Sequence, residues 1–253
     1  MKYLFFIFFC CTTVLFSQTG KITYNNVLNY SGSKPKQVEG NLYFNSQESI
    51  YINLNKTEII DNNTKSGDII ITNTDSIGYR YYHNLQSKKF ICRETVLDEF
   101  KLKYYIYEDY LASEIQWKLS NEFKLISDYN CQKAIGEFRG RIFEAWFTPD
   151  IPLPYGPWKL GGLPGLILEV YDSTHEVYFS AEQIIIPYEK TNGIINEPRS
   201  DPKISQKEFV QMNENSSGRI SKALLSRMPE GAKITSIQVK RSGIELEYEW
   251  EKK

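Results

Sequence analysis

The sequence predicts a mainly β protein, built on a single curved antiparallel sheet (an incomplete barrel), with one helix in the C-terminal half. Short segments of alternating polarity recur at close to the 8–12-residue spacing of antiparallel meanders. Aromatic residues make up 14% of the 253 residues and include 18 Tyr, which favours strands. About a dozen strands are expected, and a twisted sheet of more than about ten strands must curl or split.

The N-terminal half contains strand patterns without a helix candidate. The predicted strands cover residues 21–30, 42–44, 49–54, 68–72, 77–82, 89–94 and 102–108. The clean alternation of 42–44 and 49–54 predicts a hairpin. Residues 31–40 and 61–67 are rich in Ser, Gly, Asn and Lys, so we interpret them as a loop and a turn.

The C-terminal half adds further strands and the helix. The predicted strands cover residues 115–119, 131–138, 142–147, 166–171, 176–186 and, as a strand or a hairpin, 234–250. A polar segment, 190–203, precedes a helix over 205–227. Ser205 can cap this helix, with Glu208 in the capping-box position. Residues 213–218 weaken its middle, so two short helices are an alternative.

The stretch 152–171, PLPYGPWKLGGLPGLILEVY, organises the rest of the chain. Four prolines and four glycines precede an apolar run that starts at Leu166. Pro164-Gly165 is the dipeptide that a type II turn favours. The run lacks strict alternation, which is typical of a strand covered on both faces. We expect a rigid loop, folded into the protein, that leads into a central strand.

This stretch resembles a known family. Residues 162–167, Gly162-Leu163-Pro164-Gly165-Leu166-Ile167, spell the signature of the GLPGLI family, secreted proteins of Bacteroidetes. The resemblance extends from about Trp117 to Asp172 through DYNCQKA at 128–134, RGR at 139–141 and AWFT at 145–148. It implies an exported protein, an approximate fold and a structural role for the hexapeptide. It implies no biochemical activity.

The charge balance bears on the possible partners, and the N-terminal residues indicate the cellular compartment. Lys plus Arg number 30 and Asp plus Glu 31, so nothing predicts a nucleic-acid partner. Lys2, the apolar residues 3–16 and Ser17 form a signal-peptide pattern, which divides the chain into a signal at 1–17 and a single GLPGLI domain at 18–253. No later segment approaches 18 apolar residues, so we expect no transmembrane segment after cleavage. Export to the periplasm or the extracellular space follows, and association with the outer membrane is left open.

Two cysteines remain once the signal is removed. Cys92 and Cys131 can form one disulfide, which an oxidising compartment favours. Two buried thiols in separate strands are the alternative.

Catalytic and metal motifs are missing from the sequence. There is no H-x-x-x-H, C-x-x-C, G-x-S-x-G or phosphate-binding loop, so we assign no catalytic residue, metal or cofactor. A Cys131–His175 nucleophilic pair would make the protein an uncharacterised hydrolase. The simpler interpretation is a structural cysteine and a histidine in a turn.

The leading functional hypothesis is non-enzymatic binding of an apolar or amphipathic ligand, a lipid or a lipidated chain. A curved sheet with one helix in its hollow would form a groove for such a ligand. The LolA-type lipoprotein carriers have this arrangement, and the analogy to them is one of fold alone. Trp158, Leu163 and Leu166 are the expected groove or lid residues. The alternative is an interaction module that docks an envelope protein through an edge strand or a tyrosine-rich surface.

Three cations near the motif stretch could bind a ligand headgroup. Arg139 and Arg141 flank Gly140, and guanidinium groups bind carboxylate or phosphate in a bidentate manner. Lys159, between Trp158 and Leu160, could face a headgroup or solvent. The alternative is that the arginines pair with acidic residues of the chain itself, and Glu137, Glu144 and Asp150 lie near in sequence.

Overall fold

The computed structural model describes residues 19–30, 34–54, 76–98, 101–112, 114–191, 193–225, 241 and 243–252. The predicted signal at 1–17 and the predicted strand at 68–72 lie outside these residues, as does part of the predicted closing strand at 234–250.

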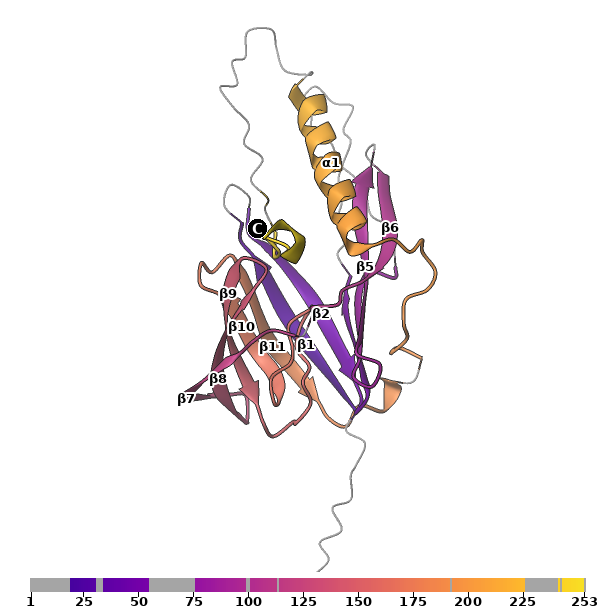
Figure 1. Ribbon diagram of the computed structural model, residues 1–253. Helices are drawn as coiled ribbons and strands as arrows, with labels where there is room; N and C mark the ends of the chain where they lie inside the picture. Colours follow the sequence, from indigo (N-terminus) through magenta and orange to yellow (C-terminus); the bar gives the residue numbers. More distant parts are fainter. Residues whose placement is uncertain are drawn as a thin grey trace, which may run out of the picture.

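Eleven antiparallel strands form one sheet in the order β6-β5-β4-β3-β2-β1-β11-β10-β9-β8-β7, which confirms the predicted fold class (Figure 1). The strands are β1 Gly20–Leu28, β2 Lys36–Phe44, β3 Glu48–Asn53, β4 Tyr79–Asn84, β5 Lys89–Asp98, β6 Lys101–Glu108, β7 Lys118–Ile126, β8 Tyr129–Phe138, β9 Arg141–Thr148, β10 Leu166–Asp172 and β11 Val177–Ile185. Two meanders, β1–β6 and β7–β11, meet where β1 pairs with β11. The sheet is open, and β6 and β7 are its edges.

Several strand boundaries differ from the prediction. β2 begins at Lys36, inside the predicted loop, because its exposed polar residues pair with β1 from Leu28 onward. β7 runs over Lys118–Ile126 in place of the predicted 115–119. It is an edge strand whose side chains are mostly exposed, among them Phe123 and Leu125, so the pattern of a half-buried strand is weak there.

The helix is confirmed as a single element, α1, Gln206–Leu225. The Ser205 hydroxyl accepts a hydrogen bond from the Glu208 amide at 3.1 Å and so caps the helix. Phe209 packs on Tyr107 of β6 with ring centroids 4.7 Å apart, which fixes α1 against β5 and β6. None of the helices in the described part of the chain is long and apolar enough to span a membrane.

The predicted strand or hairpin near the C-terminus is wrong for the described residues 243–250. This segment is extended but forms no ladder, and it ends in a 3-10 helix, η2, Glu249–Glu251. The amides of Leu246 and Glu247 donate to the carbonyl of Arg139 at 2.9 and 3.2 Å. Two of the charged side chains that give the segment its alternation, Glu245 and Glu249, form ion pairs with buried cations, as described below.

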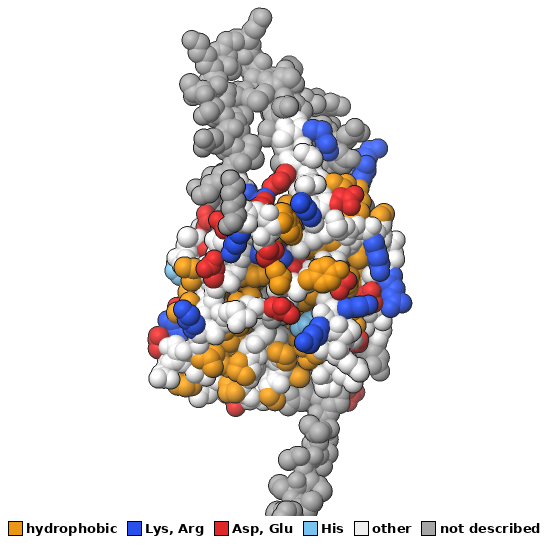
Figure 2. All heavy atoms as spheres, viewed as in Figure 1, with side chains coloured by type: hydrophobic (Ala, Val, Ile, Leu, Met, Phe, Trp, Pro, Cys, Tyr) orange, Lys and Arg blue, Asp and Glu red, His pale blue; other side chains and the backbone are white. Residues whose placement is uncertain are grey.

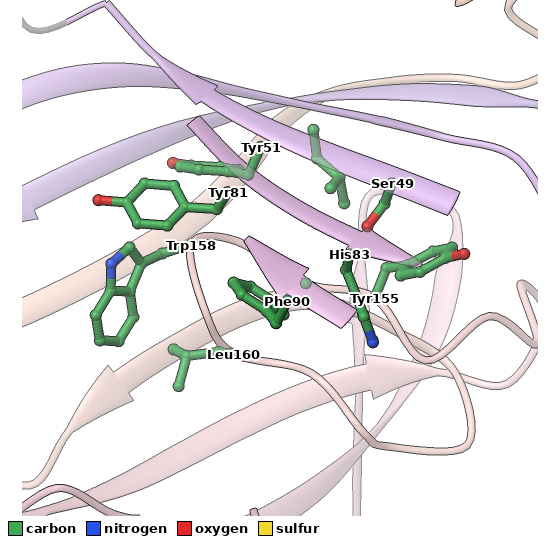
Figure 3. Close-up of a pocket in the computed structure, with 10 residues that line it drawn as sticks. Ser49, Tyr51, Tyr81, His83, Phe90, Tyr155, Trp158 and Leu160 are labelled. Carbon is green, nitrogen blue, oxygen red and sulfur yellow. The ribbon is translucent and has the colours of Figure 1, made fainter. Parts of the chain in front are cut away.

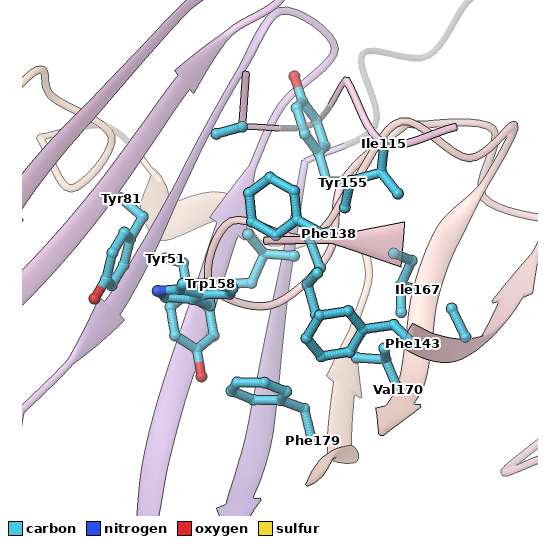
Figure 4. Packing of buried hydrophobic residues seen from close by; sticks show 14 of the residues in the cluster. Tyr51, Tyr81, Ile115, Phe138, Phe143, Tyr155, Trp158, Ile167, Val170 and Phe179 are labelled. Carbon is cyan, nitrogen blue, oxygen red and sulfur yellow. The ribbon is translucent and has the colours of Figure 1, made fainter. Parts of the chain in front are cut away.

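Residues 149–165, which join β9 to β10, fill the hollow of the sheet; we call them the motif loop. Trp158 is 6% exposed and packs edge-on against Tyr81 of β4 and Phe138 of β8, so it bridges the two meanders (Figure 4). Trp117 Nε1 donates to the carbonyl of Gly161 at 2.8 Å. The loop is therefore a packed plug.

The predicted type II turn at Pro164-Gly165 is wrong. Within the hexapeptide 162–167, the left-handed backbone conformation falls on Gly162, with φ of 87°. Gly165 is needed for a different reason: a Cβ there would lie 2.2 Å from the carbonyl oxygen of Thr148. Leu166 and Ile167, immediately after it, are fully buried in β10, as predicted for a strand covered on both faces.

The face seen in Figure 2 mixes acidic and basic side chains without a block of one sign, and hydrophobic side chains gather on its lower part. This distribution agrees with the nearly neutral composition.

Candidate functional site

A buried ionic cluster anchors the motif loop. Lys159 is 0% exposed, and its Nζ lies 3.1 Å from Asp109 Oδ2 and 3.0 Å from Glu245 Oε1. The hydroxyl of Tyr107 accepts a further hydrogen bond from it at 3.0 Å. Burial opposes the charged form of Lys159, yet Glu245 and Asp109 raise its pKa well above the usual value. Lys159 is therefore a structural cation.

Arg139 completes this cluster from the turn between β8 and β9. Its guanidinium donates two hydrogen bonds of 2.7 Å to the carboxylate of Asp109 and also contacts Glu245. Burial alone would raise the pKa of Asp109, but Lys159 and Arg139 hold it well below its usual range.

The turn that carries Arg139 is strained. Arg139 and Gly140 form a two-residue hairpin loop with φ of 45° and 81°, as a type I′ turn requires. A side chain in this left-handed region costs about 1–2 kcal/mol. Ion pairs on both sides of Arg139 hold it there, which explains why the turn does not carry the usual Asn-Gly.

Arg141 anchors the C-terminal segment at a second point. Its guanidinium lies 2.6 Å from Asp172 and 2.8 Å from Glu176, and it donates to the carbonyl of Gly243 at 2.7 Å. The expectation that Arg139, Arg141 or Lys159 binds a headgroup is corrected here, because carboxylates of the chain itself occupy all three. The expected partners were also wrong, because the true ones converge from distant segments.

A cavity of about 330 Å³ remains open between the sheet, α1 and the C-terminal segment, and its strand residues come from β1, β3, β4, β5 and β11. Its aromatic lining comprises Tyr30, Tyr51, Tyr79, Tyr81, Trp158 and Phe179. Its polar lining comprises Asn26, Asn53, Glu94, Thr95, Asn213 and Glu245. The volume lies at the lower end of the roughly 300–1,000 Å³ of small-molecule sites. In Figure 3 the hydroxyls of Tyr51 and Tyr81 point to one side, away from His83.

Two amide groups in this lining have unused hydrogen-bonding capacity. Asn26 is 1% exposed; its Oδ1 accepts from the Tyr51 hydroxyl at 2.8 Å, while its Nδ2 has no partner within the described residues. Asn53 Oδ1 is likewise buried without a described partner. A buried polar atom left unpaired costs about 1–3 kcal/mol, so these atoms mark a place where a ligand could gain hydrogen bonds.

Glu94 supplies the acidic group of the cavity. It lies deep in the wall, near the hydroxyls of Tyr81 and Tyr107, and remains partly accessible. Burial raises the pKa of Glu94; Lys159 opposes this shift and Glu245 adds to it.

The described residues form two further hollows. The one around His83, Ser49 and Tyr155 measures about 10 Å³, space for about one water, and burial lowers the pKa of His83 to about 4 (Figure 3). The other, of about 400 Å³, lies at the start of α1 beside Tyr107 and Trp250.

The two cysteines are free thiols, so the predicted disulfide is not formed. Cys92 lies on β5 and Cys131 on β8, each one strand in from an opposite edge of the sheet. Both are fully buried, and burial raises the pKa of each thiol. The alternative of two buried thiols in separate strands is what the structure shows.

The proposed Cys131–His175 pair is not assembled. Cys131 sits near the end of β8 that pairs with Phe147 of β9, whereas the turn containing His175 bonds to Ile142 at the other end of β9. His175 is exposed and stacks on Tyr171, with ring centroids 5.2 Å apart. It is the histidine in a turn of the simpler interpretation.

Of the three expected groove residues, the structure places only Trp158 at the cavity. Leu163 and Leu166 belong to the core, at 1% and 0% exposure. The residues missed by sequence reasoning come from the N-terminal strands. The spacing of these residues in the sequence could have indicated a shared surface. Tyr51 and Asn53 are two positions apart, as are Tyr79 and Tyr81, so each pair lies on one face of its strand.

Comparison with family models gives one match. Residues 138–169 match a family described as a protein of unknown function (Porph_ging). The match spans the β8–β9 turn, the motif loop and the hexapeptide at 162–167. It is consistent with the resemblance seen in the sequence without establishing the GLPGLI name. A search of curated proteins finds no match.

Two solved structures, both described as PNGF-II, share the fold. The C2 crystal form gives a TM-score of 0.54 at 20% identity, and the P21 form 0.55 at 18%. Each alignment covers 79% of this chain but only 33% and 34% of theirs, so the chain spans about a third of the length of these structures. At this identity the likeness shows the fold alone.

Proposed function

We propose that the protein is a non-enzymatic binding protein, exported to the cell envelope, whose cavity beneath α1 takes one end of an amphipathic ligand such as a lipid or a lipidated chain. The observation that carries the proposal is the pairing of aromatic walls with two buried amide atoms, Asn26 Nδ2 and Asn53 Oδ1, that have no partner among the described residues. Asn26 offers a donor and Asn53 an acceptor inside a largely aromatic hollow. Sites for small molecules combine these two features.

The volume of the cavity limits how much of a ligand it can hold. About 330 Å³ suits a headgroup or a short apolar segment, so the remainder of a longer ligand would lie outside. The motif loop occupies much of the hollow with buried residues, among them Trp158, Leu160 and Leu163.

A variant that fills the cavity tests this proposal. Asn213 lies on α1 and lines the cavity, while Asn215, two residues along the same helix, does not. We expect the neutral fluorescent probe N-phenyl-1-naphthylamine to bind the wild-type protein saturably and Asn213→Trp at least ~10-fold more weakly, because the indole occupies the site.

Asn215→Trp is the matched control and should bind the probe within about 2-fold of wild type. Thermal unfolding of each variant verifies that it is folded. Equal binding by Asn213→Trp, or no saturable binding to the wild-type protein, would refute the proposal.

A further inference from the structure

The cavity carries an excess of negative charge. Its described lining includes the carboxylates of Glu94 and Glu245 and no lysine or arginine. Behind the wall, Lys159 and Arg139 are shared among Asp109, Glu245 and the half-exposed Glu249. Two buried cations are therefore outnumbered by the carboxylates around them, and Glu94 has no cation within salt-bridge distance among the described residues.

The aromatic lining, like the carboxylates, favours a positively charged ligand. The face of an aromatic ring attracts a cation within about 6 Å, and tryptophan does so most strongly. Trp158 already does this for a residue of the chain, since Lys159 Nζ lies 5.3 Å from its ring centroid. Tyr51 and Tyr81 extend the aromatic wall beside it (Figure 4).

The amides add a second requirement. Asn26 Nδ2 can donate and Asn53 Oδ1 can accept, and neither has a partner in the described structure. A hydroxyl group has the chemistry to match both atoms, because it accepts one hydrogen bond and donates another. Asn26 and Asn53 both line the cavity, so a small rotation of either side chain would bring its amide to an occupant of the site.

We propose that the cavity binds an organic ammonium ion that also carries a hydroxyl group, with the ammonium beside Glu94 and the aromatic wall and the hydroxyl between the two amides. The inference rests on the proposed function, because it names the chemical class of the polar end of the ligand.

Choline and its neutral isostere 3,3-dimethylbutan-1-ol separate charge from shape. Both carry a hydroxyl, and they differ in having nitrogen or carbon at the branch point. By calorimetric titration, we expect choline to bind and the neutral alcohol to bind at least ~10-fold more weakly. Equal affinities, or no choline binding, would overturn the inference.

Glu94→Gln tests the residue, and Glu144→Gln is its matched control. Glu144 is likewise a partly buried carboxylate near a tyrosine hydroxyl, that of Tyr171, and it lies 2.9 Å from Lys133, but it is on the other face of the sheet. Choline affinity should fall at least ~10-fold in Glu94→Gln and stay unchanged in Glu144→Gln. An unchanged affinity in Glu94→Gln would contradict the proposal.

Two further measurements keep the test decisive. Asn53→Asp adds a carboxylate to the wall and should tighten choline binding several-fold. This variant tests the role of charge even if Glu94→Gln fails to fold, and weaker or unchanged binding would count against the proposal.

The naphthylamine probe separates the proposed binding function from the proposed cationic ligand. Probe binding without choline binding overturns only the cationic ligand, whereas loss of both overturns the binding function as well.

Discussion

Substitution of Lys159 by methionine should lower the free energy of unfolding by about 3–5 kcal/mol, because it leaves buried carboxylates facing too little positive charge. Methionine keeps most of the side-chain volume, so the loss comes from the charge. The side chains of Lys159 and Asp109 are both fully buried and that of Glu245 is 11% exposed, so water can replace little of the lost interaction.

Lys124→Met provides the comparison for Lys159→Met. Lys124 pairs with Glu169 at 2.7 Å, but its side chain is one-third exposed, so the loss should stay below about 1 kcal/mol. Urea unfolding followed by circular dichroism measures both variants. If Lys159→Met cost no more than Lys124→Met, the ionic cluster would not be the anchor of the motif loop.

Trp158→Ala should destabilise the protein by a comparable amount, about 3–5 kcal/mol, through the loss of buried contact and the cavity that remains. Trp158 joins β4 to β8 across the hollow, so its removal weakens the contact between the two meanders. Its backbone, with φ of 56°, stays strained in the alanine variant. A loss of ligand in this variant would therefore reflect unfolding as much as the loss of a binding surface.

Trp250→Ala is the corresponding control. Trp250 is 36% exposed on η2 and stacks on Tyr248, with ring centroids 4.7 Å apart. Its truncation should cost about 1 kcal/mol, as expected for a partly exposed aromatic pair. Thermal midpoints that place Trp158→Ala within a few degrees of the wild-type protein would contradict the description of the motif loop as a packed plug.

Much of the fold could be predicted from the sequence because strand signals are local. Alternation identified β3, β5 and β6, and the continuous apolar run identified β10. The edge strand β7 was misplaced because its exposed apolar residues break the rule that links periodicity to burial. At residues 243–250 the rule failed in the opposite way, because alternation there serves ion pairing.

The candidate site could be predicted only in part, for a physical reason. Asp109, Arg139, Lys159 and Glu245 are far apart in the chain, and a charged residue considered alone is expected to be exposed. Only the three-dimensional fold shows that the four meet and neutralise one another. The motif loop was correctly identified as the organising element, yet the cavity beside it is built largely by Asn26, Tyr51, Tyr81 and Glu94 from strands that the motif does not include.

The most direct test of the binding function is native mass spectrometry of the protein purified from the organism that makes it. We expect the wild-type protein and Asn215→Trp to carry an additional small-molecule mass that Asn213→Trp lacks. A bare wild-type protein, or the same additional mass on Asn213→Trp, would contradict a ligand in the cavity beneath α1.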